Sequence, residues 1–348
     1  MIFIPEKYTR TIKLGNLIIG GNFPVLIETM SRVSLLKKNE FLQEYAEIEQ
    51  AGADILRVAV RCSEEAEAFG VIKNNISLPV IADIHKDYQL GVLSAQKGFS
   101  MIRVNPGNTS AKGLQNIALA SVDYNVAIRV GLNTGSLVLR NIEVIPIIEQ
   151  ELMKTLDIFE TSGQKNLMIS AKDSHVESNI IINEKISSMT DYPLHIGLTE
   201  AGLGLSGIVK SSISIGNLLF KGIGNTIRVS LTDGPVKEVK VAKAILNNIT
   251  KQVKGLNLIS CPGCSRTRID VLKLATLVNE LIGDLGENYT LAVMGCEING
   301  PGEAKGADIG LYGSPEGIVV SLKGVFQGIK TQDETLKWLS SFLKKKLQ

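Results

Sequence analysis

The chain has 348 residues, a formal net charge of +2 at pH 7 and a charged fraction of 21%. This near-neutral balance provides no long-range field for nucleic acid or for an anionic membrane surface, so neither partner is expected and any anion site must be local. Apolar residues make up 44% of the chain, but no uninterrupted apolar run approaches the roughly 18 residues of a membrane span.

The N-terminal segment MIFIPEKYTRTIK holds a Pro and a Glu within its first six residues and lacks the basic and apolar regions of a secretory signal. We therefore expect a cytoplasmic protein. The length favours two domains, although a single (β/α) barrel can take about 250 residues.

Eight short β-branched, apolar runs recur at intervals of about 22 to 41 residues and predict strands. They begin at Val25, Ala53, Pro79, Met101, Val126, Leu167, Pro193 and Thr226. The segments between them, such as residues 37–51 and 236–249, space their apolar residues three and four apart, as helices do. This α/β alternation predicts a TIM (β/α)8 barrel, with a doubly wound open sheet as the alternative. No dinucleotide glycine fingerprint follows the first strand, which favours the barrel.

The region after the eighth strand-helix pair predicts a second unit. Residues 247–254 read as the end of a helix and a linker, so we predict a substrate-binding barrel over residues 1–253 and a second domain over residues 254–348. In this domain we expect strands within residues 256–263, 289–295, 307–314 and 317–326, and helices over residues 267–285 and 333–347. This mixture is typical of a small α+β domain.

Polar side chains end the predicted barrel strands, where chemistry collects in this fold. They are Arg57, Arg61, Asp83, His85, Arg103, Asn105, Arg129, Asn133, Lys172, Glu200, Arg228 and Ser230. Five arginines and one lysine at one opening predict a site for a small, multiply charged anion, with a diphosphate as the leading candidate, because guanidinium groups suit phosphate oxygens. The alternative for any single residue is a structural ion pair, such as Arg57 with Asp83. His195 lies inside a strand, and we expect it to be structural.

Three of the four cysteines lie in the second region. Cys261 and Cys264 form CPGC, and Cys296 follows after 31 intervening residues. Thiolates on short loops suit zinc or an iron-sulfur cluster, and both normally take four ligands. A structural zinc site therefore stays open beside the cluster.

The fourth ligand must come from elsewhere, and the candidates are Cys62, Glu297 and Glu303. Glu303 follows the segment Asn299–Gly302, which we expect to be a flexible turn able to fold back toward the cysteines. A carboxylate is a harder ligand for iron than a thiolate, so three cysteines and one glutamate would leave one exchangeable corner on a cluster.

Seven motifs in the chain resemble those of the 4-hydroxy-3-methylbut-2-enyl diphosphate synthase family. They are SCPGCSRT, VMGCEINGPGEAKGADIG, IADIHKDY, IRVNPGN, IRVGLNTGSL, GLTEAG and IRVSLTDGP, in the family's order over almost the whole chain. The resemblance implies a TIM barrel, a C-terminal [4Fe-4S] cluster domain, and a homodimer in which the cluster domain of one subunit caps the barrel of the other. It also implies reductive ring opening of 2-C-methyl-D-erythritol 2,4-cyclodiphosphate, with flavodoxin or ferredoxin as the electron donor.

The resemblance also assigns roles to residues. It implies Cys261, Cys264, Cys296 and Glu303 as cluster ligands; Arg57, Arg103, Arg129, Lys172, Arg228 and Ser230 as diphosphate contacts; and Asp83, Asn105, Asn133, Thr199 and Glu200 as the polar lining. In this scheme Glu200 is the candidate acid for the leaving hydroxyl group, and Glu303 is the ligand that gives up its iron.

The sequence departs from the family pattern at a few positions. Glu28 stands where a glutamine is usual, Lys86 replaces an aromatic residue after His85, and Arg61-Cys62 replaces a proline-containing step. We expect all of these positions at the rim of the barrel.

Two other interpretations of the cysteine motif remain. One is a non-catalytic, zinc-stabilised phosphate-binding or scaffold protein. The other is a radical-initiating cluster, but such clusters usually take three cysteines from one tight loop, and Cys296 is far from the other two.

Overall fold

The computed structural model describes residues 4–5, 7–133, 144–249, 256–282 and 289–346. It divides into two compact units, one of residues 2–249 and one that holds residues 250–348. The predicted domain boundary after residue 253 falls within residues 250–255, outside the described residues, and stays a prediction.

The first unit is a barrel of eight parallel strands in the order β8-β7-β6-β5-β4-β3-β10-β9. These strands are β3 (Leu26–Met30), β4 (Ile55–Ala59), β5 (Val80–Asp83), β6 (Met101–Val104), β7 (Ala127–Asn133), β8 (Leu167–Lys172), β9 (His195–Ile196) and β10 (Thr226–Ile227). A parallel bridge between Ile169 and Leu194 joins β8 to the start of β9 and closes the sheet. The prediction of a TIM barrel is therefore confirmed over the open sheet, and each strand lies within its predicted run.

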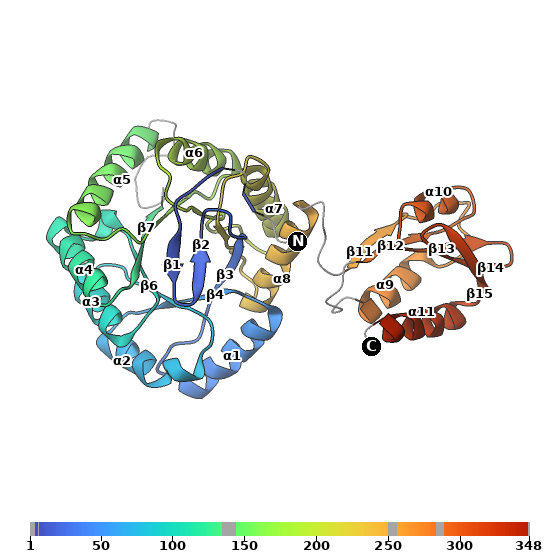
Figure 1. Cartoon of the computed structure of the whole chain (residues 1–348), viewed down its shortest axis with the longest axis horizontal. Helices are drawn as coiled ribbons and strands as arrows, with labels where there is room; N and C mark the ends of the chain where they lie inside the picture. Colours follow the sequence, from blue (N-terminus) through green and yellow to red (C-terminus); the bar gives the residue numbers. More distant parts are fainter. Residues whose placement is uncertain (1–3, 6, 134–143, 250–255, 283–288, 347–348) are drawn as a thin grey trace. The chain divides into compact units, whose positions relative to one another are not determined.

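Helices follow the strands and form a ring around them (Figure 1). They are α1 (Lys38–Ala51), α2 (Ser63–Ile72), α3 (Tyr88–Lys97), α4 (Ala111–Asp123), α5 (Val144–Thr161), α6 (Val176–Met189), α7 (Gly204–Phe220) and α8 (Pro235–Ile249), with short 3-10 turns at Lys73–Asn75 and Pro106–Asn108. Their ends follow capping rules: the Asp87 side chain accepts a hydrogen bond from Gln89 N at the start of α3, and Gly98 ends that helix in the left-handed conformation.

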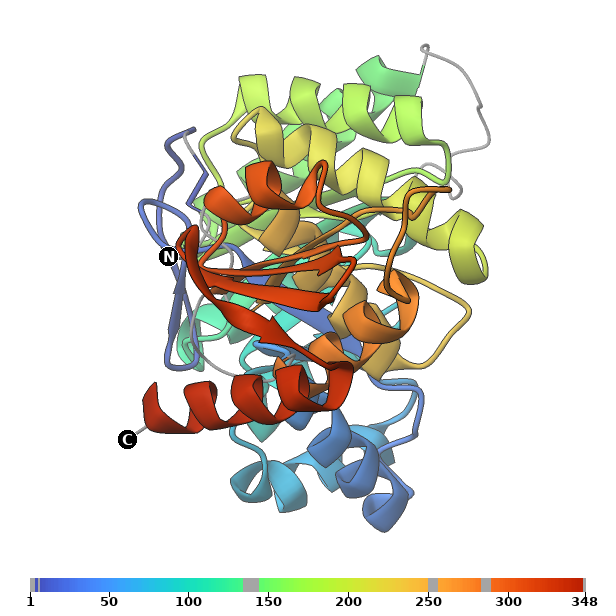
Figure 2. The same ribbon diagram turned by 90° about the vertical axis from the view of Figure 1, so that its right-hand side faces the viewer.

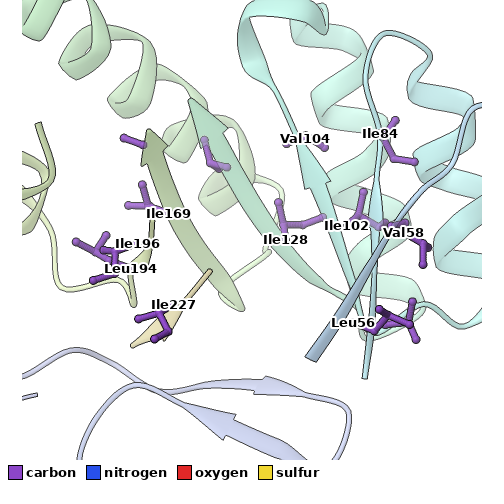
Figure 3. Close-up of a cluster of buried hydrophobic side chains, with 14 of the residues drawn as sticks. Leu56, Val58, Ile84, Ile102, Val104, Ile128, Ile169, Leu194, Ile196 and Ile227 are labelled. Carbon is purple, nitrogen blue, oxygen red and sulfur yellow. The ribbon is translucent and has the colours of Figure 1, made fainter. Parts of the chain in front are cut away.

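The main core lies between the strands and this ring of helices. Successive side chains of a strand point to opposite faces of the sheet, so every second residue meets the helices. Figure 3 shows this layer, which includes Val58, Ile102, Ile128 and Ile196, all buried. The other half of each strand faces the barrel interior.

A hairpin covers the N-terminal end of the barrel. Strands β1 (Ile12–Leu14) and β2 (Leu17–Ile19) pair antiparallel and lie over the centre of the barrel in Figure 1. The buried Ile12, Leu14 and Ile19 form one cluster with the first inward-facing residues of six strands, namely Leu26, Ile55, Ile81, Met101, Ala127 and Met168. This hairpin was not predicted from the sequence.

The second unit has a five-stranded mixed sheet in the order β11-β12-β13-β14-β15. Its elements are β11 (Leu256–Ser260), α9 (Val271–Ile282), β12 (Tyr289–Met294), α10 (Gly300–Lys305), β13 (Ile309–Ser314), β14 (Gly317–Leu322), β15 (Val325–Lys330) and α11 (Gln332–Lys346). Helices α9 and α11 pack on one face of the sheet, where Leu274, Val278 and Leu339 are buried, and Figure 2 shows α11 beside the strands. The predicted α+β character is confirmed. Helix α10 is additional, and the run predicted as one strand over residues 317–326 instead holds β14 and the start of β15, which pair antiparallel.

None of the helices within the described ranges combines the length and the apolar character that crossing a bilayer requires.

Candidate active site

A charged layer lies inside the barrel, two residues beyond the apolar layer under the hairpin. Inward-facing residues recur at every second position of a strand. Charged residues therefore follow, on the same face, five residues of the apolar layer: Leu26, Ile55, Ile81, Met101 and Ala127. The charged residues are Glu28, Arg57, Asp83, Arg103 and Arg129, and all of them are largely or fully buried. The sequence therefore places charges deep in the barrel and not only at the strand ends.

Asp83, at the end of β5, binds two arginines. Arg57 Nη2 donates to Asp83 Oδ2 at 2.7 Å, and Arg103 Nη1 donates to Asp83 Oδ1 at 3.4 Å. Burial alone would raise the pKa of Asp83, but the charge of Arg57, a hydrogen bond from His85 and the charge of Arg103 hold it well below its usual range. Burial lowers the pKa of Arg103 to about 10, because Asp83 offsets only part of the desolvation. The expected ion pair between Arg57 and Asp83 is therefore present, and the role of Arg57 in the anion site stays a prediction.

Arg129 forms a fully buried pair with Glu28 of β3, in which Arg129 Nη2 donates to Glu28 Oε1 at 3.1 Å. Burial works to raise the pKa of Glu28, but the adjacent charge of Arg129 lowers it, so this carboxylate stays ionised. Our expectation that Glu28 lies at the rim is wrong. Its side chain is inside the barrel because it lies on the inward face of β3, between Leu26 and Met30.

Lys172, at the end of β8, is buried, and its Nζ lies 2.9 Å from His195 Nε2. Burial, followed by the positive charge of Arg228, lowers the pKa of Lys172 well below its ordinary value. Burial and the charge of Lys172 likewise lower the pKa of His195. The imidazole is therefore neutral at physiological pH.

Arg228 follows β10 and faces Glu238 of α8, with Nε 3.7 Å from Glu238 Oε2. The same carboxylate accepts hydrogen bonds from Thr29 Oγ1 at 3.0 Å and from Leu231 N at 3.1 Å. Burial raises the pKa of Glu238, and Arg228 opposes this change only in part.

Several guanidinium N–H groups of the barrel make no hydrogen bond within the described residues. The Nε atoms of Arg57, Arg129 and Arg228 are buried and have no hydrogen-bond partner within the described residues. A buried charged donor without a partner is costly, so it indicates a missing acceptor. Three such donors inside one barrel fit an anion with several oxygens.

The other predicted lining residues occupy varied positions. Asn105 is buried, but its Oδ1 accepts a hydrogen bond from Gly107 N at 3.1 Å, which stabilises the turn after β6. Thr199 and Ser230 are half-buried at the ends of β9 and β10. Glu200 is exposed and has a left-handed backbone conformation with φ of 52°. The side chain of Asn133 lies outside the described residues.

Arg61 does not belong to the buried group. Its side chain is 67% exposed and donates to the buried Glu65 through Nε at 3.2 Å. Glu65, one helical turn later on α2, binds the Arg61 side chain, and the prediction that Arg61 joins the anion site stays a prediction.

In the second unit, two cysteine-bearing loops follow neighbouring parallel strands. Cys261 comes directly after β11, and its N donates to Val293 O of β12 at 3.2 Å. Gly295 N, at the end of β12, lies 3.1 Å from Cys261 Sγ, which places the loop of Cys296 beside the loop of Cys261. Hydrogen bonds from the backbone N–H groups of Asn299 and Ile298 lower the pKa of Cys296, which favours a thiolate.

Glycines and Thr267 bring these loops close together. A Cβ atom at Gly295 would lie 2.9 Å from Thr267 Oγ1, and one at Gly313 would lie 2.4 Å from Gly295 O. Thr267 Oγ1 in turn accepts a hydrogen bond from Cys264 N at 2.8 Å. The missing side chains at Gly295 and Gly313 thus allow the loops to pack closely.

Glu303 lies on α10 and is exposed. The expectation of a flexible turn over Asn299–Gly302 is wrong, because a helix begins at Gly300, with Pro301 in its first turn. Within the described residues no three His, Cys, Asp or Glu side chains converge as ligands of one metal ion. A [4Fe-4S] cluster spreads its ligands over several irons, and three thiols on two adjacent loops fit that donor set.

Two carboxylates and one imidazole that contact the buried cations were missed or assigned no site role from sequence. Glu28 lies in the run VLIETM, Glu238 lies in a helix, and His195 was expected to be structural. The available signal was the alternation of Glu28 with Leu26 and Met30 along one strand, since that phase points inward.

Fold and site together define a TIM-barrel protein whose interior holds a buried cluster of arginines, a lysine and carboxylates, joined to a unit with adjacent cysteine loops. The GcpE TIM-barrel domain matches residues 9–243, and the GcpE protein C-terminal domain matches residues 257–345. The chain belongs to the GcpE family.

Curated relatives match over nearly the full chain. The 4-hydroxy-3-methylbut-2-en-1-yl diphosphate synthase (flavodoxin) of Caldanaerobacter subterraneus subsp. tengcongensis is 40% identical, covering 97% of this chain and 98% of its own. The protein of the same name from Caldicellulosiruptor saccharolyticus is 42% identical, covering 93% and 95%.

A solved structure shares the barrel fold at low identity. The dihydropteroate synthase of Stenotrophomonas maltophilia with active-site-bound imidazole aligns with a TM-score of 0.52 and 14% identity, over 68% of this chain and 98% of that one. At this identity the match concerns the fold alone.

Proposed function

We propose that this chain is an iron-sulfur oxidoreductase of isoprenoid biosynthesis by the non-mevalonate pathway. It converts 2-C-methyl-D-erythritol 2,4-cyclodiphosphate to 4-hydroxy-3-methylbut-2-enyl diphosphate, the product in its relatives' name. The observation that carries the proposal is the set of buried arginine Nε–H groups without acceptors, in a barrel of the GcpE family. Family membership favours this activity over the zinc-stabilised phosphate-binding protein.

The buried cations bind the diphosphate in this proposal. Arg57, Arg103, Arg129, Lys172 and Arg228 supply N–H donors from five different strands or strand ends, and carboxylates fix the orientation of the arginines. These charges stabilise the ring phosphate oxygen as its bond to carbon breaks, since fixed charges in a buried site act more strongly than in water. Ser230, Asn105, Asn133 and Thr199 complete the polar lining.

The reaction consumes two electrons and releases one hydroxyl group as water. Glu200 is the proposed acid that gives this hydroxyl a proton, and its place after β9 puts it at the C-terminal end of the barrel strands. A hydroxyl group leaves far more easily as water than as hydroxide, so the proton must be delivered as the carbon-oxygen bond breaks.

A [4Fe-4S] cluster is the proposed cofactor, with Cys261, Cys264, Cys296 and Glu303 as its ligands. Such a cluster supplies electrons one at a time. The loops after β11 and β12 hold two of the cysteines side by side, and Gly295 N–H points at Cys261 Sγ, as second-sphere donors do in tuned metal sites.

Flavodoxin is the proposed electron donor, as in the names of the curated relatives, with ferredoxin as the alternative. The proposed assembly is a homodimer. Helix α7 supports it, because Leu205, Val209, Ile213 and Phe220 expose 46 to 78% of their surface along one side of the helix. A cytoplasmic location remains a prediction.

Anaerobic turnover of the cyclodiphosphate with a chemical reductant tests this function. We expect the wild type to form the linear diphosphate, Cys296→Ser to lose both the brown cluster absorption and turnover, and Glu303→Ala to lose turnover. Cys62→Ser is the matched control, because Cys62 lies at the start of α2 in the barrel unit, and it should keep both properties. A colourless, zinc-loaded wild type, or full turnover by Cys296→Ser, would contradict the proposal.

A further inference from the structure

A buried chain of polar side chains runs across four neighbouring strands of the barrel. Lys172 of β8 contacts His195 of β9 between Nζ and Nε2 at 2.9 Å. His195 Nδ1 lies 2.8 Å from Thr226 Oγ1 of β10 and 3.6 Å from Glu28 Oε2 of β3. The His195 side chain is 1% exposed, so these groups are its hydrogen-bonding environment in place of water.

The chemistry of lysine fixes the direction of these hydrogen bonds. A lysine ammonium group has three donors and no acceptor, so a protonated Lys172 can only donate to His195 Nε2. The imidazole must then carry its hydrogen on Nδ1, which faces Thr226 Oγ1 and the carboxylate of Glu28. Both oxygens can accept it, so the tautomer and the orientation of Lys172 are set together.

The surroundings of Lys172 make this acceptor important. Arg57, Arg129 and Arg228 all act against a positive charge on Lys172, and Glu28 is the carboxylate that favours it. Neutral His195 stabilises the ammonium group through a hydrogen bond without adding another positive charge. Without His195, the Lys172 amine would have the three guanidinium groups nearby and one hydrogen-bond acceptor fewer, so its ammonium form would be less stable.

We propose that His195 is a positioning residue, which accepts a hydrogen bond from Lys172 through Nε2 and thereby holds the Lys172 ammonium group ready for the bound diphosphate. This inference rests on the proposed function for the nature of the anion. It replaces our expectation that His195 serves only the fold. His195 acts through Lys172 and does not itself touch the reacting atoms.

Binding of inorganic diphosphate to the full chain tests this inference without turnover. Removing the acceptor in His195→Leu should weaken binding about tenfold at neutral pH, which is the loss of one hydrogen bond to a charged group. Affinity should also be lost at a lower pH than in the wild type, because the ammonium form of Lys172 is less stable. His195→Gln should restore most of the affinity, since its amide oxygen can accept from Lys172.

A double-mutant cycle separates positioning from a merely structural role. In a Lys172→Met background, His195→Leu should have no further effect on diphosphate binding, because the group that it positions is gone. Circular dichroism and thermal unfolding check that each variant is folded.

An equal loss from His195→Leu with and without Lys172 would overturn the inference, and so would a His195→Gln variant as weak as His195→Leu. A wild type that does not bind diphosphate would overturn it together with the anion site. Diphosphate binding with the expected cycle, but without turnover of the cyclodiphosphate, would support the positioning role and contradict only the proposed reaction.

Discussion

Each of the four buried or largely buried arginines of the barrel interior lies beside a carboxylate. Asp83 forms ion pairs with Arg57 and Arg103, Glu28 with Arg129, and Glu238 with Arg228. An unpaired buried guanidinium would cost several kcal/mol, so these carboxylates make the cationic site compatible with folding. With Lys172 there are, among the described residues of this layer, five basic side chains beside three carboxylates, which suits the diphosphate that we propose as the ligand.

Asp83→Asn tests how this pairing contributes to stability. Because the folded pKa of Asp83 is lowered, its contribution is present above the unfolded pKa of about 3.9 and is lost as pH falls through the folded pKa. We expect the variant to lose about 3 kcal/mol of unfolding free energy at pH 7. Urea denaturation should show this difference shrinking below pH ~4. A constant difference between pH 7 and pH 3 would contradict the role assigned to Asp83.

Gly131→Ala tests the position of Arg103. A Cβ atom at Gly131 would lie 2.3 Å from Arg103 Nε, so Arg103 must move. We expect diphosphate affinity to fall about tenfold and stability to fall by about 1–3 kcal/mol. In the control, Gly216→Ala on α7, the new Cβ meets its nearest neighbour at 3.9 Å, and the variant should bind as the wild type does. Unchanged binding by Gly131→Ala would argue against Arg103 as a ligand contact.

At the scale of elements, the β1–β2 hairpin explains why the charged layer can lie so deep. The hairpin and the six inward-facing apolar residues that pack against it fill the N-terminal end of the barrel. The charges therefore rest on a dry apolar layer, and only their other side can be reached from the strand ends.

Leu14→Ala should weaken this closure. Leu14 is fully buried in the hairpin cluster, and we expect the free energy of unfolding to fall by about 3 kcal/mol from the lost contacts and the cavity. Ile18, on the same hairpin, is 37% exposed, so Ile18→Ala should cost well under half as much. Urea denaturation of both variants decides the matter, and equal losses would show that the hairpin is not part of the core.

The sequence predicted the barrel strands well because each combines an apolar run with a polar end. It could not predict the pairing of Glu28 with Arg129, because their 101-residue separation is bridged only when the barrel closes. Helix α10 was missed because Gly-Pro-Gly is a poor helix former. Its helix is possible where Gly300 packs against Tyr312, since a Cβ there would lie 2.4 Å from Tyr312 Cβ.

At the scale of the whole molecule, the apolar side of α7 bears on assembly. A row of Leu205, Val209 and Ile213 at four-residue spacing is more than the scattered apolar residues of an ordinary surface. The proposed homodimer would remove this surface from water.

A doubly charged α7 variant, Val209→Glu with Ile213→Glu, should be monomeric in analytical ultracentrifugation, because burying two carboxylates in an apolar interface is costly. Val71→Glu on α2 is the control, since Val71 is 72% exposed outside this row. It should leave the dimer intact. A dimer that persists in the double variant would place the interface elsewhere.

The closed N-terminal end of the barrel also limits how substrate enters and product leaves. Leu14 and its neighbours fill the N-terminal end of the barrel, so its interior is open only at the C-terminal ends of the strands. The linear diphosphate must therefore leave by the same opening through which the cyclic substrate enters. Substrate binding and product release then use the same opening, so a new substrate molecule can bind only after the product has left.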